Sequence, residues 1–195
     1  MRIKKYFLAF ALILIAIALV SCASNPKNIG PSASLSVLSQ ADIKNGYLGS
    51  SQNENPYMEP LSLVRGRQTE FVIIRINISI SSEASVNFYA SVKNETGENL
   101  ADLKTKDEFI RFWQGWQGDP MLNRQRELNI QQTYIPASDF SLKPGNYTYY
   151  AVLMAKYPIP RPAKIHAELN VSGVSPAILD IPLADPSVGR PKGLF

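Results

Sequence analysis

The chain is poor in the side chains on which metal sites and many enzymes depend, since it contains one cysteine, Cys22, and one histidine, His166. A single cysteine excludes a disulfide framework within the chain and a cysteine-based metal cluster. Zinc then lacks ligands, because its protein sites are built mainly from Cys and His. No glycine-rich phosphate loop, G-x-S-x-G elbow or H-E-x-x-H motif occurs in the sequence. We therefore expect no metal, no cofactor and no enzymatic activity, and we interpret His166 as a solvated imidazole on the polar face of a strand.

A large excess of charge of one sign is also missing. The formal net charge is +4, but Arg2, Lys4 and Lys5 stand ahead of an apolar N-terminal run. The rest of the chain is close to neutral, which argues against a nucleic-acid partner.

The N-terminal run is a candidate export signal. The apolar residues 7–20 are fewer than the roughly 20 needed for a permanent membrane span. They end at Leu19-Val20-Ser21-Cys22, which resembles the lipobox of bacterial lipoproteins. The resemblance implies cleavage between Ser21 and Cys22, a thioether-linked lipid on Cys22, and attachment to the membrane through acyl chains. The alternative is a short N-terminal anchor helix with an incidental cysteine.

These features predict four parts and a location. Residues 1–21 are a signal peptide, 22–33 the lipidated cysteine and a flexible tether, 34–183 a β-sandwich domain, and 184–195 a mobile tail. A lipoprotein of this kind resides in the bacterial cell envelope. Ala23, rather than Asp, follows the cysteine, which favours the outer membrane.

Beyond the tether, apolar residues recur with a period of two. In residues 70–80, for example, four isoleucines alternate with polar side chains, which is typical of a half-buried strand. Strands are predicted at 33–38, 60–64, 70–80, 85–93, 127–134, 146–155, 164–171 and 177–183, with 70–80 and 85–93 as a neighbouring pair. Residues 100–117 suit either a helix or a strand. Short strands with turn signals between them predict an all-β, antiparallel sandwich.

One motif resembles the E–F corner of immunoglobulin-like domains. In the segment 142–149, Leu142 is followed by Pro144, Gly145 and Tyr147. The resemblance implies that Leu142 packs in the core, that Pro144-Gly145 turns the chain, and that the Tyr147 hydroxyl bonds to backbone upstream. It therefore makes the sandwich immunoglobulin-like.

Two segments are candidates for binding. Trp113 and Trp116 stand beside glycines and amides, a composition suited to stacking on sugar rings or anchoring a protein; alternatively, Trp113 fills the sandwich core and Trp116 covers its edge. In residues 156–162, alternating prolines display Tyr157, Ile159 and Arg161, or merely stiffen a loop.

The sequence thus predicts a membrane-anchored envelope lipoprotein that acts as a non-catalytic protein-interaction or scaffold module. The alternative is a glycan-binding lipoprotein that uses Trp113 and Trp116. If the proline-rich segment joins strands F and G of an immunoglobulin-like fold, it faces the membrane, and the Pro144-Gly145 end projects away.

Overall fold

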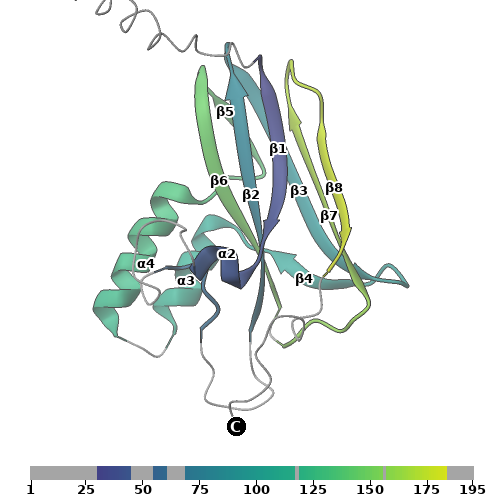
Figure 1. Cartoon of the computed structure of the whole chain (residues 1–195). Coiled ribbons are helices and arrows are strands. Elements are labelled where there is room, and N and C mark those ends of the chain that lie inside the picture. Colours follow the sequence, from purple (N-terminus) through teal and green to yellow (C-terminus); the bar gives the residue numbers. More distant parts are fainter. Residues whose placement is uncertain (1–29, 45–54, 61–68, 117–118, 156, 184–195) are drawn as a thin grey trace, which may run out of the picture. The chain divides into compact units, whose positions relative to one another are not determined.

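The computed structural model describes residues 30–44, 55–60, 69–116, 119–155 and 157–183 (Figure 1). The chain divides into two units, 1–30 and 31–195, and the elements below belong to the second. The described part of this unit contains the strands β1 (Ser32–Leu38), β2 (Glu70–Ile80), β3 (Ala84–Asn94), β4 (Asn99–Leu103), β5 (Asp139–Leu142), β6 (Gly145–Ala155), β7 (Ala163–Val171) and β8 (Ala177–Pro182), and the helices α2 (Gln40–Lys44), α3 (Lys106–Gln114) and α4 (Pro120–Thr133).

The strands form an antiparallel, nearly closed sandwich. One sheet has the order β1-β2-β6, and the other has β3 paired with β7, β7 with β8, and β5 on the opposite edge of β3. The short strand β4 pairs with both β6 and β3 and so joins the sheets along one side, while β1 packs beside β8 on the other. In immunoglobulin terms β1, β2 and β6 hold positions A, B and E, and β3, β7 and β8 hold C, F and G.

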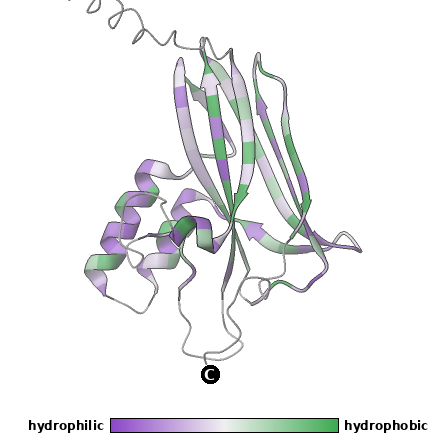
Figure 2. Cartoon of the chain, in the orientation of Figure 1, coloured by the Kyte–Doolittle hydropathy of each residue, from purple (hydrophilic) through white to green (hydrophobic). Residues whose placement is uncertain are grey.

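The two halves of β2 show how the sequence produces this arrangement. From Ile74 to Ile80 the isoleucines are buried and the residues between them are not, because only one face meets the opposite sheet. Hydrophobic and hydrophilic residues accordingly alternate along β2 (Figure 2). Phe71 to Ile74, in contrast, is an unbroken buried run. Phe71 contacts Phe109 and Trp113 of α3, which shows that the helices cover the second face of the sheet here.

The helices begin with clear local signals. Thr105 caps α3, and its side chain and that of Glu108 each bond to the other's backbone amide as a capping box. Asp119 caps α4 and Pro120 follows at its first position. The helical layer, α3 and α4, packs against β6 through an aromatic cluster. Tyr57, Phe109, Trp113 and Tyr134 are fully buried in it, and Tyr150 of β6 is buried beside them.

Most predicted strands are confirmed, including those at 33–38, 70–80, 85–93, 146–155, 164–171 and 177–183. The strand predicted at 127–134 is wrong, since nearly all of it is helical and belongs to α4. The segment left open at 100–117 contains all but the first residue of β4, followed by α3. The strand predicted at 60–64 lies outside the described residues, apart from Pro60.

The predicted pairing of 70–80 with 85–93 is also wrong. Their strands β2 and β3 lie in opposite sheets, because β2 pairs with β1 and β6 whereas β3 pairs with β4, β5 and β7. The short link at 81–83 crosses from one sheet to the other instead of closing a hairpin.

Candidate functional site

The turn between β5 and β6 holds the corner residues. The Tyr147 hydroxyl donates to the carbonyl of Lys143 at 2.9 Å, and Leu142 is buried. The tyrosine ring lies over Gly145, where an added Cβ would approach ring atoms to 3.3 Å. A side chain at this position would press against the ring, which would have to shift by a few tenths of an ångström to admit it.

The corner does not, however, precede strand F. Strand β6, which follows it, pairs with β2 and so takes position E. Position F belongs to β7, which lies between β3 and β8. The assignment of Pro144-Gly145 to an E–F corner is wrong. The same kind of hydrogen bond occurs here in the connection from β5 to β6, which precedes strand E.

Trp113 is not available to a sugar. Its side chain is 1% exposed, and its indole N–H donates to the carbonyl of Pro56 at 3.1 Å. The Arg126 guanidinium lies 4.2 Å from the ring centroid. Trp116 is partly buried, with its ring 6.3 Å from that of Trp113. Burial therefore contradicts stacking on Trp113; the ring fills the space between the helices and the sheet, not the space between the two sheets.

Only one of the three side chains predicted to be displayed by the proline-rich loop is exposed. Tyr157 is 58% exposed, whereas Ile159 is 3% exposed. Arg161 forms an ion pair with Glu70 of β2, whose carboxylate also accepts the backbone N–H of Ile159 at 2.7 Å. The predicted display of Ile159 and Arg161 is wrong, because the loop is bound to the start of β2.

Two buried tyrosines connect the helical layer to the sandwich. The Tyr134 hydroxyl donates to Lys104 O at 2.6 Å and accepts from Val152 N at 3.1 Å. Thr133 Oγ1 gives its only proton to the carbonyl of Asn129, so the Tyr57 hydroxyl must donate to Thr133 across 2.8 Å. Burial raises the pKa of both phenols above its ordinary value, which keeps them neutral hydrogen-bond donors.

Among the described residues, the ionisable side chains form no cluster that suits catalysis or metal binding. His166 is half-buried on the outer face of β7, opposite Ser91 and Asp180. No group of three or more His, Cys, Asp and Glu side chains that could hold a metal occurs in the described ranges. Within the same ranges, none of the helices has the length and apolar character that a membrane crossing requires.

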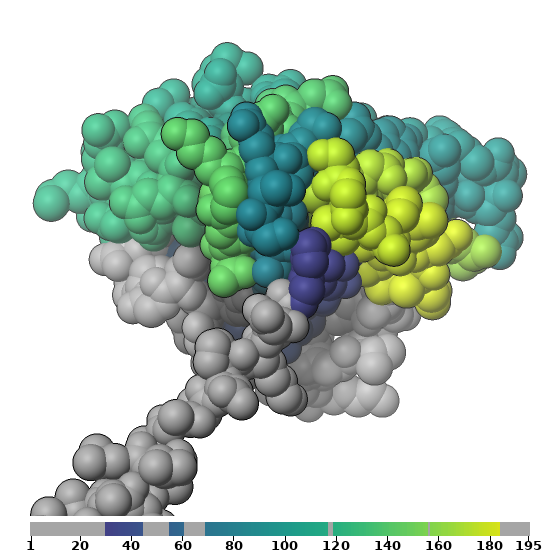
Figure 3. Space-filling model, turned by 90° about the horizontal axis from the view of Figure 1, so that it is seen from above, coloured from purple at the N-terminus to yellow at the C-terminus, as the bar shows by residue number. Residues whose placement is uncertain are grey.

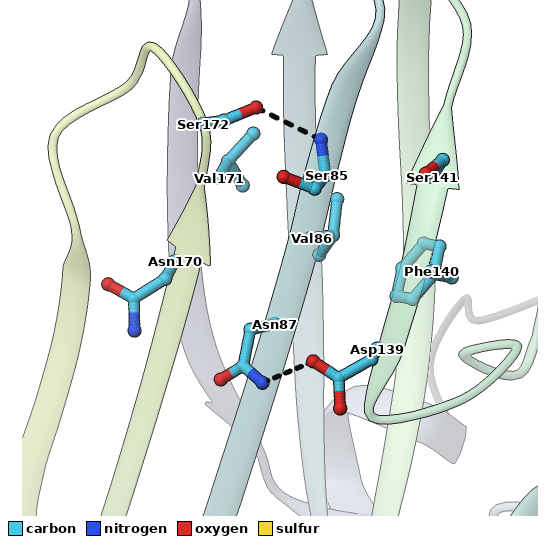
Figure 4. Close-up of a pocket in the computed structure, with 9 residues that line it drawn as sticks. All are labelled: Ser85, Val86, Asn87, Asp139, Phe140, Ser141, Asn170, Val171 and Ser172. Atoms are coloured by element: carbon cyan, nitrogen blue, oxygen red, sulfur yellow. Dashed lines mark hydrogen bonds between the residues drawn. The ribbon is translucent and has the colours of Figure 1, made fainter.

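A groove that the sequence analysis missed lies on the outer face of the second sheet (Figure 4). Its volume is about 590 Å³, and it crosses the adjacent strands β5, β3 and β7. Asn87 Nδ2 donates to Asp139 Oδ1 at 2.5 Å across its floor. The outward-facing polar residues that line it are Ser85, Asn87, Asp139, Ser141, Asn170 and Ser172. Alternation in β3 predicts that Ser85 and Asn87 share a face, but only the register brings Asp139 and Asn170 beside them.

Comparison with known proteins assigns no family. No protein-family model matches the sequence, and no curated protein matches it. Among solved structures, the chain resembles a conjugative transposon lipoprotein from Bacteroides eggerthii with 8% sequence identity and a TM-score of 0.27. The match covers 78% of this chain and 97% of that one. A likeness of this size carries no argument about function.

Proposed function

We propose that the chain is a bacterial envelope lipoprotein, anchored through acyl chains on Cys22, whose sandwich binds another envelope protein without catalysing a reaction. The N-terminal residues support the anchor, because Leu19-Val20-Ser21-Cys22 follows a basic start and an apolar run in the order that a lipoprotein signal requires.

The position of β1 supports an orientation for the anchored domain. Its first residue, Ser32, lies opposite Ser79 near the end of β2, and Ser79 lies opposite Asn146 at the start of β6. The chain therefore enters the sandwich at the end that carries Pro144-Gly145. Seen from this end, β1 lies between β2 and the strands β7 and β8 (Figure 3).

This register favours the orientation opposite to the one expected from the sequence. The proline-rich loop joins β6 to β7, positions E and F, and lies at the opposite end, since Glu70 pairs with Ala155. The eleven residues of the proposed tether, from Cys22 to Ser32, would have a mean reach of about 18 Å as a coil. The eleven residues of β2 then place the far end about 36 Å beyond. In an anchored protein, Pro144-Gly145 faces the membrane and the proline-rich loop projects away from it.

The far end carries the features expected of a contact surface. Tyr157 is 58% exposed and Met121, at the start of α4, is 81% exposed. Both side chains are large enough to act as anchors for a partner. We therefore place the protein-binding surface on the proline-rich loop and the helical layer.

Cys22→Ala tests the anchor. We expect this variant to lose the lipid and to leave the detergent phase or remain as an uncleaved precursor. Mature protein that still partitions into detergent would refute lipidation at Cys22.

Single cysteines at Asn146 and Tyr157 test the orientation in the lipid-anchored protein, where the Cys22 sulfur is blocked by its thioether. Fluorophores at the two sites are compared on vesicles that contain headgroup-labelled quenching lipids. We expect quenching at Asn146 and little at Tyr157; equal or reversed quenching would overturn the orientation.

Photo-crosslinking in intact cells from Met121 and Tyr157, with Asn146 as the control, then tests the partner surface. Crosslinks only at Asn146, or at none of these sites, would count against a partner at the far end.

A further inference from the structure

The groove over β5, β3 and β7 offers side chains rather than backbone to a ligand. Strand β3 runs through its middle and is paired with β5 on one edge and with β7 on the other. A peptide cannot add to β3 here, because strand addition needs an unpaired edge. On this face, recognition would come from the Ser, Asn and Asp side chains that point outward (Figure 4).

Hydrogen bonds orient several of these side chains. Asn87 Nδ2 donates to Asp139, as described above, and Asn170 Nδ2 donates to Glu168 Oε1 at 2.8 Å. The Ser85 backbone N–H donates to Ser172 Oγ at 3.0 Å. An ionised carboxylate has about four acceptor sites and an amide has two donors and an acceptor oxygen. Asp139 and the two asparagines can therefore form further hydrogen bonds with a ligand on the outer face of the sheet.

The charge of the groove selects against anions. Its lining includes Asp139 and contains no Lys, Arg or His. Glu168 lies two residues from Asn170 on the same face of β7. A phosphate or a carboxylate would be repelled. Hydroxyl groups, which donate as well as accept, match carboxylate and amide side chains of this kind.

An exposed aromatic ring continues the same face. Tyr89 follows Asn87 by two residues on β3, about 6.6 Å further along the strand, and its side chain is 50% exposed. Its ring centroid lies 6.3 Å from that of His166 on β7, so it remains over the sheet. An aromatic face of this kind packs on the apolar face of a sugar ring, while a polar row beside it binds hydroxyls.

We propose that the outer face of β5, β3 and β7 binds a neutral saccharide chain, with Tyr89 stacking on one sugar ring and Asn87, Asp139 and Asn170 binding the hydroxyls of the next. The site is separate from the far-end protein surface, and it replaces Trp113 and Trp116 as the location of a glycan site. It does not depend on the proposed partner.

The test uses the full chain in a sugar-free detergent, dodecyldimethylamine oxide. Cellohexaose, maltohexaose and chitohexaose are titrated, with an oligogalacturonate as the anionic comparison. We expect at least one neutral hexasaccharide to shift the side-chain amide resonances of Asn87 and Asn170, and the oligogalacturonate to leave them unchanged. The proposal would be overturned if none of the three neutral hexasaccharides shifted these resonances.

Variants separate the site from general effects on the protein. We expect Tyr89→Ala to weaken the affinity about tenfold, the scale of one aromatic contact, and Asn87→Ala to weaken it as well. Tyr157→Ala, which removes another exposed tyrosine, is the matched control and should bind like the parent. Circular dichroism of each variant confirms that it is folded. Parent-like affinity in both groove variants, or an equal loss in the control, would refute this location.

Discussion

The guanidinium of Arg161, in the loop between β6 and β7, is paired with the carboxylate of Glu70 at the first position of β2. Arg161 Nη1 lies 3.0 Å from Glu70 Oε2, and the two side chains are only 19% and 13% exposed. The pair therefore joins segments about ninety residues apart in the sequence.

Glu70→Gln should destabilise the fold, because it leaves the Arg161 charge largely buried without its counter-charge. Loss of one partner of a buried pair costs about 3–5 kcal/mol, and we expect the lower part of this range because the side chains retain some contact with water. The urea midpoint measures the change. Glu83→Gln, at an exposed position, is the control, and an equal midpoint for the two variants would contradict the prediction.

Tyr147→Phe should lower the free energy of unfolding by about 0.5–1.5 kcal/mol, the contribution of one hydrogen bond. It removes only the bond to Lys143 O and keeps the ring over Gly145. Tyr149→Phe is a matched control, since Tyr149 lies two residues further along β6 and its ring stacks at 5.9 Å from that of Tyr147. If both variants unfold at the parent's denaturant concentration, the corner bond contributes nothing.

Trp113→Ala should cost about 3–5 kcal/mol, as expected for the removal of a fully buried aromatic. The variant also loses the bond to Pro56 O and the contact with Arg126. Trp116→Ala should cost clearly less because Trp116 is only partly buried. Thermal unfolding of the two variants provides the comparison, and a larger loss for Trp116 would mean that the aromatic cluster is centred elsewhere.

Stability should fall as the pH rises above about 10, the ordinary pKa of tyrosine. Burial raises the pKa of Tyr57 and Tyr134 in the folded state. The unfolded chain therefore releases these protons first, and the contribution of the two phenols is complete below pH 10 and declines above it.

Tyrosinate absorbance during alkaline titration measures this effect. We expect the signal of Tyr57 and Tyr134 to emerge only together with loss of the folded circular dichroism spectrum. In Tyr57→Phe, the increase in tyrosinate absorbance that accompanies unfolding should be smaller than in the parent by the contribution of one tyrosine. Ionisation of all the tyrosines before unfolding would contradict the assignment.

Local patterns in the sequence predicted most strands correctly. The isoleucines of residues 74–80 alternate because only one face of β2 is buried there. The helix at 120–133 was mistaken for a strand in its second half, although Asp119 and Pro120 form a start signal that could have revealed it. The weak amphipathic pattern of α4 hides its helical period, since Ile130 is its only buried residue in the part of the chain that the structure describes.

The sequence by itself determined most of the β-strands, the tyrosine that bonds across the corner and the candidate lipidation site at Cys22. Each depends on residues that are close together in the chain. Tertiary structure alone decided that β2 and β3 lie in opposite sheets, that Trp113 is buried beneath the helices, and that Asp139 and Asn170 flank Asn87. It also decided which end of the sandwich receives the tether, because antiparallel pairing between distant segments sets direction and register, and no local pattern specifies which strand becomes the neighbour.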